Sequence, residues 1–90
     1  MNYIHDARLL IADAALHPDL ERLYLLLILA RGTNTTLANV HDAWAIWKDT
    51  HHPSHPSLIP FDELSYATQE LDRPFMDAIH RAARTFEEMP

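Results

Sequence analysis

The sequence predicts an all-α fold, a small single-domain bundle of four main helices over residues 1–90. Apolar residues recur at helical spacings of three and four in four separate segments. No segment alternates apolar and polar residues over a sustained stretch, as a half-buried strand does. The chain is 48% hydrophobic and has no cysteine, so we expect its core to form without a disulfide.

The first helix is expected over residues 3–16. Its apolar residues share one stripe: Ile4, Ala7, Ile11 and Ala14. The stripe ends before Pro18, which pushes the preceding His17 away from helical backbone angles. Asp19 is then placed to start or cap a second helix over residues 19–31.

The second helix is apolar nearly all round, because leucines and isoleucines fill most positions from residue 23 to residue 29. A helix of this kind is usually surrounded by its neighbours, so we expect it at the centre of the core. Gly32, the only glycine in the chain, follows at the point where a left-handed residue ends a helix.

The third helix is expected to run from a cap at Thr35 or Thr36 to Asp49. Its apolar residues again form one stripe: Leu37, Val40, Trp44 and Trp47. Both indoles are expected to pack in the core from this stripe. An indole with one solvent-exposed edge would instead anchor a partner or a ligand.

The segment HHPSHPSLIPFDEL, residues 51–64, holds three histidines and three prolines. Prolines fix extended or turn conformations, so we expect a stiff Pro/His-rich crossover before the last helix. This crossover should pack its leucine and phenylalanine and leave its histidines near water. One helical turn is compatible with PFDEL, and Ser65 is able to cap another turn through Gln69.

The last long helix is expected to begin at Asp72, which acts as its cap, with Pro74 in the first turn. Its stripe consists of Phe75, Ile79, Ala82 and Phe86. Asp72 and Arg73 also offer half of a charged binding site. The cap explains the position of Asp72 without any ligand, and we favour that interpretation.

Residues 40–84 contain a His and a Trp three apart, a His-Pro-x-Leu-x-Pro-aromatic-x-x-Leu block and an Asp-Arg pair. The members of this pattern are His41, Trp44, His55, Pro56, Leu58, Pro60, Phe61, Leu64, Asp72 and Arg73. In their order and spacing these residues resemble the ryanodine-receptor repeat domain, which also occurs in bacterial and phage proteins. The segment between Trp44 and His55 is shorter than in that repeat and lacks its Gly-rich, aromatic middle.

The whole chain is also similar to short uncharacterised proteins of actinobacteria and their phages, which carry a HDAW…HPSL.PF.EL signature. The resemblance to the ryanodine-receptor repeat implies a helical module that binds nucleotide-like ligands or mediates protein contacts. It does not imply an enzyme.

The histidines of the crossover are candidate metal ligands, because imidazoles three or four apart can converge on one ion. For His51, His52 and His55, however, prolines separate the ligands and no cysteine joins them. We therefore expect a solvated loop, no metal site and no cofactor. His55 is better placed to bond a backbone group and fix the turn before Leu58 and Phe61.

No catalytic residue is expected. A Ser-His-Asp set can be assembled from Ser54, His55 and Asp62, but nothing resembles a nucleophile elbow and no glycine is available for an oxyanion turn. One glycine is also too few for a phosphate-cradling loop.

Thirteen acidic residues against seven basic ones give a formal charge of −6, which repels a phosphate backbone. Nucleic acid is therefore not expected as a partner. The N-terminal residues do not have the features of a signal peptide. No apolar stretch approaches the length of roughly 20 residues that a helix needs to cross a bilayer. We expect a cytoplasmic protein without membrane contact.

Two classes of function remain. The favoured one is a non-enzymatic interaction module, an accessory protein of phage or actinobacterial origin. It would bind another protein through an acidic helical surface. A homodimer is another way to cover the apolar second helix. The other is a sensor of a small, nucleotide-like ligand, with a pocket near Trp44, His55 and Arg73. The candidate binding residues are His41, Trp44, Trp47, His55, Phe61, Asp72 and Arg73.

Overall fold

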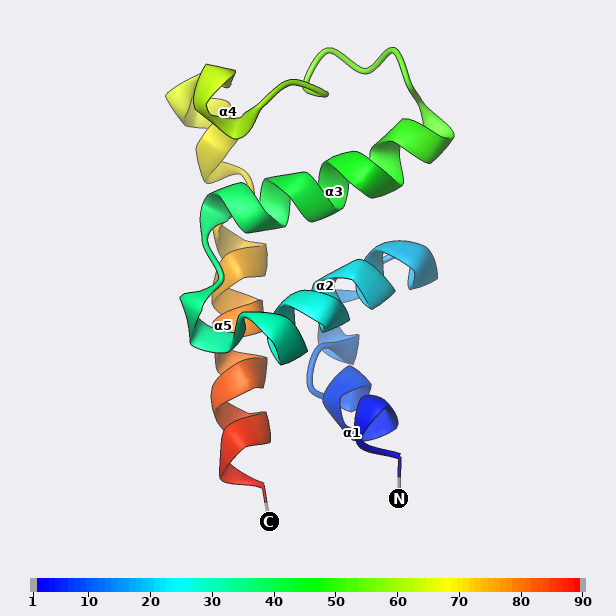
Figure 1. Ribbon diagram of the computed structural model, residues 1–90, viewed down its shortest axis with the longest axis vertical. Helices are drawn as coiled ribbons and strands as arrows, with labels where there is room; N and C mark the ends of the chain where they lie inside the picture. Colours follow the sequence, from blue (N-terminus) through cyan, green and yellow to red (C-terminus); the bar gives the residue numbers. More distant parts are fainter. Residues whose placement is uncertain (1, 90) are drawn as a thin grey trace.

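The computed structural model describes residues 2–89, and the regular elements within them are all helical, which confirms the all-α prediction. The α-helices are α1 (Tyr3–Leu9), α2 (Pro18–Ala30), α3 (Leu37–His51), α4 (Tyr66–Glu70) and α5 (Arg73–Glu88). Three short 3₁₀ turns lie at Ala12–Ala14, Gly32–Asn34 and Phe61–Glu63. In Figure 1, α2 and α3 pack side by side, α5 crosses both, and the two ends of the chain lie at the same end of the molecule.

The first helix is shorter than predicted. It ends at Leu9, and a 3₁₀ turn leads to Ala15, whose φ of 54° is left-handed. The predicted stripe still faces the core, since Ala7 and Ile11 are both buried. The chain reverses here so that α2 can pack against α1, and helical periodicity alone does not show where such a reversal starts.

The second helix begins at Pro18, and its cap is His17. Asp19, which was predicted to start or cap this helix, lies in its first turn and is not the cap, because the Nδ1 atom of His17 accepts a hydrogen bond from the Asp19 backbone N–H at 3.1 Å. The position before a proline is held in an extended conformation, here with ψ of 138°, which is the backbone that an N-cap requires. At the other end, Gly32 has the predicted left-handed φ of 58°.

The core is one cluster drawn mainly from α2, α3 and α5. Its buried members are Ile11, Leu20, Tyr24, Ile28, Val40, Ala43, Ile79, Ala82 and Ala83. The second helix is central to it but not surrounded, because Leu26 is 60% exposed. Thr36 caps α3 in a reciprocal capping box with Asn39, as the sequence suggested for one of the two threonines.

The crossover leaves the end of α3, passes over one end of the molecule and returns to α4 (Figure 1). It includes the one helical turn considered for PFDEL, and Ser65 caps α4 as predicted. Across residues 2–89, no helix combines the length and the apolar character needed to cross a membrane.

Candidate functional site

A cavity of about 380 Å³ lies between α2, α3, the crossover and the start of α5. It falls within the range of roughly 300 to 1,000 Å³ that is usual for small-molecule pockets. Its walls are formed by Leu20, Tyr24, His41, Trp44, His55, Ser57, Thr68, Leu71, Asp72 and Phe75.

Aromatic rings supply much of the wall. The ring of His41 stacks on Trp44 with centroids 5.7 Å apart, and the ring of His55 meets Trp44 edge-on at 5.2 Å. On another part of the wall, Tyr24 and Phe75 pack with centroids 6.0 Å apart. Flat, rigid surfaces of this kind favour a flat ligand.

Hydrogen bonds to backbone atoms hold the two histidines in place. The Nε2–H of His41, a residue only 3% exposed, donates to the Ile59 carbonyl oxygen at 2.8 Å. The Nδ1 atom of His55 accepts from the Ser57 backbone N–H at 3.0 Å. The predicted turn-fixing role of His55 is therefore confirmed, and His41 ties the returning half of the crossover to α3.

Asp72 is the charged residue of this cavity. It occupies the N-cap position of α5, but its side chain makes no capping hydrogen bond, so the predicted capping role of its side chain is wrong. Within residues 2–89 this half-buried carboxylate accepts no hydrogen bond and forms no ion pair. Burial raises the pKa of Asp72 above its ordinary value, and the charge of His41 opposes that rise.

Tyr24 faces the same environment from α2. Burial raises the pKa of its hydroxyl well above the ordinary value, and the negative charge of Asp72 raises it further. The phenol therefore stays neutral and can both donate and accept a hydrogen bond at the cavity.

The seven predicted binding residues divide into two groups. His41, Trp44, His55 and Asp72 line the cavity together. Arg73 does not, because its guanidinium pairs with Glu70 at 2.5 Å on the exposed side of the helix. The sensor pocket predicted around Trp44, His55 and Arg73 thus has Asp72 where the arginine was expected.

The remaining two candidates lie elsewhere. Phe61 is half-buried beside His41, with ring centroids 6.2 Å apart, and it lines a separate shallow hollow with Arg73. Trp47 packs against His17 and His51 at the open end of α3.

Sequence reasoning missed several cavity residues, notably Tyr24, Ser57 and Thr68. Tyr24 had a usable signal, since it carries the one hydroxyl in an otherwise apolar run of α2. Ser57 and Thr68 had none, because the path of the crossover decides what they face. The Ser-His-Asp set that was considered does not assemble: in the described part of the chain no hydrogen bond joins Ser54 or Asp62 to His55.

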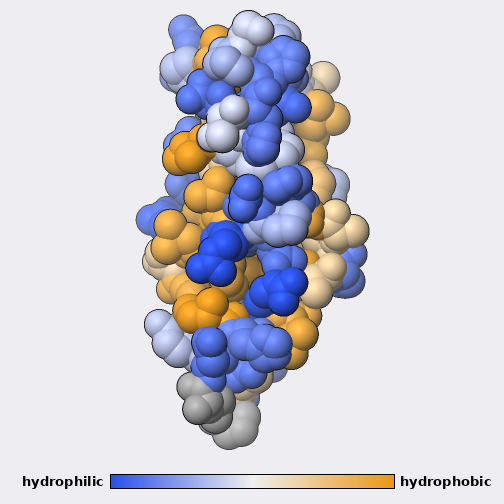
Figure 2. All heavy atoms as spheres, turned by 90° about the vertical axis from the view of Figure 1, so that its right-hand side faces the viewer, coloured by the Kyte–Doolittle hydropathy of each residue, from blue (hydrophilic) through white to orange (hydrophobic). Residues whose placement is uncertain are grey.

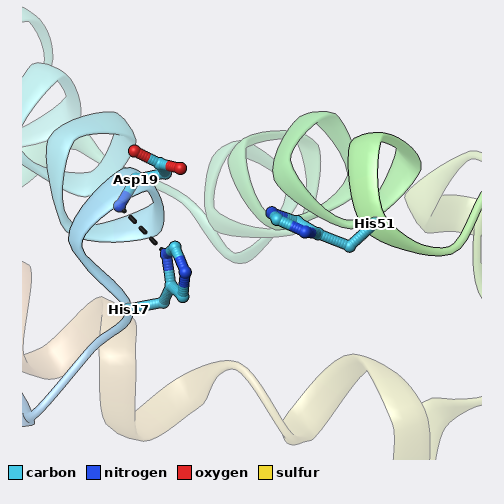
Figure 3. A group of neighbouring side chains, drawn as sticks. All are labelled: His17, Asp19 and His51. Carbon is cyan, nitrogen blue, oxygen red and sulfur yellow. Dashed lines mark hydrogen bonds between the residues drawn. The ribbon is translucent and has the colours of Figure 1, made fainter.

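A second polar cluster lies where the start of α2 packs beside the end of α3. His17, Asp19 and His51 have ligand atoms within 4.8 Å of one another, and all three residues are exposed (Figure 3). The sequence had grouped His51 with His52 and His55 instead. The structure brings His51 to His17 because the end of α3 packs beside the start of α2.

Comparisons with known proteins place the chain in a family. No curated protein and no solved structure matches it. A family model described as a domain of unknown function (DUF7701) matches residues 2–84 and so covers every element that lines the cavity. The resemblance to the ryanodine-receptor repeat stays a prediction. The chain belongs to the family described as domain of unknown function (DUF7701).

Proposed function

We propose that the chain is a non-enzymatic ligand-binding domain whose cavity takes one small planar molecule that carries N–H donors. The observation that supports this proposal is the half-buried Asp72 carboxylate, which has no hydrogen-bonding or ionic partner within residues 2–89. Partial burial of a carboxylate without a partner is unfavourable, and a ligand that donates a hydrogen bond to it would offset that cost.

The walls define the rest of the ligand. The rings of Trp44, Phe75 and the two histidines favour a flat heteroaromatic group about the size of a nucleobase. The carboxylate selects groups such as a ring N–H or an amine over ring carbonyls. No lysine or arginine lines the cavity, so a nucleotide-like ligand would enter by its base and leave its phosphates outside.

Binding without chemistry is the simplest use of this site. Each cavity histidine commits one ring nitrogen to a backbone group, and the described residues contain no hydrogen-bonded pair of nucleophile and base at the cavity. The polar atoms therefore serve to orient a ligand.

The proposal is tested by titrating 15N-labelled protein with 2-aminobenzimidazole, adenine and benzofuran, a bicycle without N–H donors. We expect 2-aminobenzimidazole and adenine, which carry N–H donors, to shift amide signals of cavity residues in a saturable way, and benzofuran not to. Asp72→Asn should weaken binding at least tenfold, since a charge-assisted hydrogen bond contributes about 1.5–3 kcal/mol. The matched control is Asp62→Asn, in an exposed acidic residue outside the cavity.

The proposal fails if none of the three probes shifts cavity residues. It fails equally if benzofuran binds as well as 2-aminobenzimidazole, or if Asp72→Asn and Asp62→Asn bind alike.

A second candidate function is protein binding, and exposed apolar side chains favour it. Leu26, Ile46 and Ile59 are 60%, 64% and 41% exposed. Two shallow hollows connect them, and both hollows include Ile46 and Asp42. With acidic Asp42 and Asp49 at its edge, this surface suits an amphipathic basic segment of another protein.

Two acidic residues in the second half of the chain do not contribute to such a surface, because Asp72 lies in the cavity and Glu70 pairs with Arg73. Asp62, Glu63 and Asp77 are exposed. Affinity capture at low salt, compared between the parent and Ile46→Glu, tests this candidate. A partner retained by Ile46→Glu would contradict binding at this surface.

A further inference from the structure

We propose that His17, Asp19 and His51 bind one divalent transition-metal ion of the Zn²⁺ class, which would link the start of α2 to the end of α3. This inference is independent of the cavity. In Figure 3, His51 extends from the last turn of α3 toward His17 and Asp19, which lie at the beginning of α2. The ligand atoms of the three side chains lie within 4.8 Å of one another.

The set of ligands suits zinc. Two imidazole nitrogens and one carboxylate are common zinc ligands, and three protein ligands leave a fourth position for water. Metal–ligand bonds of about 2.0–2.1 Å in a tetrahedral site place the ligand atoms roughly 3.3 Å apart. The present separations therefore need to close by about 1.5 Å or less, which exposed side chains achieve by rotation.

Trp47 holds the two imidazoles near each other. Its ring lies 5.5 Å from the ring of His17 and 5.0 Å from that of His51, while the two histidine rings are 5.5 Å apart. Trp47 is itself half-buried against the core. Because both rings contact this half-buried indole, each has less side-chain freedom to lose on binding an ion than a free surface histidine has, while it can still rotate.

The surroundings leave the site open to an ion. The face on the right-hand side of Figure 1 is mostly hydrophilic at its upper end, where the crossover and the end of α3 lie, and toward its middle it mixes apolar with strongly hydrophilic residues (Figure 2). His17, Asp19 and His51 are all exposed, so neither a lid nor an unfolding step separates them from solvent.

Metal binding would compete with the cap of α2. At present Nδ1 of His17 accepts a hydrogen bond from the Asp19 backbone N–H. An imidazole that gives one ring lone pair to a metal carries its proton on the other nitrogen, so neither ring nitrogen remains an acceptor. Binding therefore removes this capping bond, and a metal-free α2 keeps it.

The test is isothermal titration of the full chain with Zn²⁺, with parallel 15N spectra. We expect one Zn²⁺ per chain, and at least tenfold weaker binding for His51→Ala. His17→Asn should weaken it similarly, because asparagine is a good cap but supplies no imidazole. His52→Ala, which removes an exposed neighbouring histidine, should bind like the parent. The Asp19 amide signal should move with zinc in the parent as its bond to His17 is lost.

Several results would overturn the proposal. It is wrong if the parent does not bind Zn²⁺, or if binding is unchanged in both His51→Ala and His17→Asn, which would mean scattered surface binding. It is also wrong if His52→Ala abolishes binding while His17→Asn does not, because the ion would then sit on the crossover.

Discussion

Trp44 and Trp47 lie three residues apart on the same helix, and each contacts two histidines, yet the two clusters differ in their exposure to water. Trp44 packs with His41 and His55 in the wall of a cavity. Trp47 packs with His17 and His51 at an open end of the molecule. Each cluster also has an aspartate nearby: Asp72 is half-buried in the cavity, whereas Asp19 is exposed.

We infer from this comparison that burial, more than residue type, decides which kind of ligand each cluster favours. In the cavity the aspartate is partly removed from water and its pKa is raised, so a ligand that donates hydrogen bonds is favoured there. At the open end His17, Asp19 and His51 are exposed to water, although among the described residues the Nε1 atom of Trp47 is buried without a hydrogen-bond partner. Only a ligand that forms stronger bonds than water does, such as a transition-metal ion, gains much by binding.

The largest expected difference is between His41→Ala and His51→Ala. His41→Ala should lower the free energy of unfolding by about 2–4 kcal/mol, because it leaves the Ile59 carbonyl without its donor and opens a gap beside Trp44. His51→Ala should change it by no more than about 0.5 kcal/mol. Urea denaturation of both variants measures the two effects, and equal losses would remove the distinction between the clusters.

A smaller effect is expected at the cap of α2. His17→Ala should cost about 1 kcal/mol, because the Asp19 backbone N–H loses its acceptor. His17→Asn should recover most of this loss without restoring an imidazole. Thermal melts of the two variants separate the capping role of His17 from its contact with Trp47. If both variants are destabilised alike, the ring contact rather than the cap stabilises this end.

The smallest effect concerns Asp72 and its dependence on pH. Its folded-state pKa lies above its unfolded value, so the folded chain binds more protons between the two values and loses stability as the pH rises through the folded pKa. Asp72→Asn has no carboxylate and should be slightly more stable than the parent at pH 7. This advantage should vanish below the ordinary carboxyl pKa of 3.8.

Melting temperatures of parent and Asp72→Asn between pH 3 and pH 8 provide the measurement. The effect is small because a half-exposed carboxylate is still partly solvated. A variant that is less stable than the parent at pH 7 would show that Asp72 has a stabilising partner after all.

Much of the fold could be predicted from the sequence, because stripes and caps are local. The capping threonine of α3, the left-handed Gly32 and the turn fixed by His55 each depend on a few neighbouring residues. The early end of α1 could not be predicted, since it depends on how α2 packs back.

The cavity was harder to predict than the helices. Four of its residues were predicted, but Asp72 was given a capping role and Arg73 a place in the pocket. Which of two adjacent residues at the start of α5 faces inward depends on the rotation of that helix, and this is a tertiary property. The pairing of His17 with His51 was missed for the same reason.

One crossed titration tests the central claim most directly. Trp47→Phe leaves Trp44 as the only indole, and Trp44→Phe leaves Trp47, so fluorescence reports on one cluster at a time. With 2-aminobenzimidazole, we predict a saturable change in the Trp44-only protein that is lost when Asp72→Asn is added, and little change in the Trp47-only protein. With Ni²⁺, which quenches nearby indoles, we predict a saturable loss of fluorescence in the Trp47-only protein and little change in the Trp44-only protein. A 2-aminobenzimidazole response that is equal at both tryptophans, or absent at Trp44, would contradict the claim that the enclosed cluster is a ligand site.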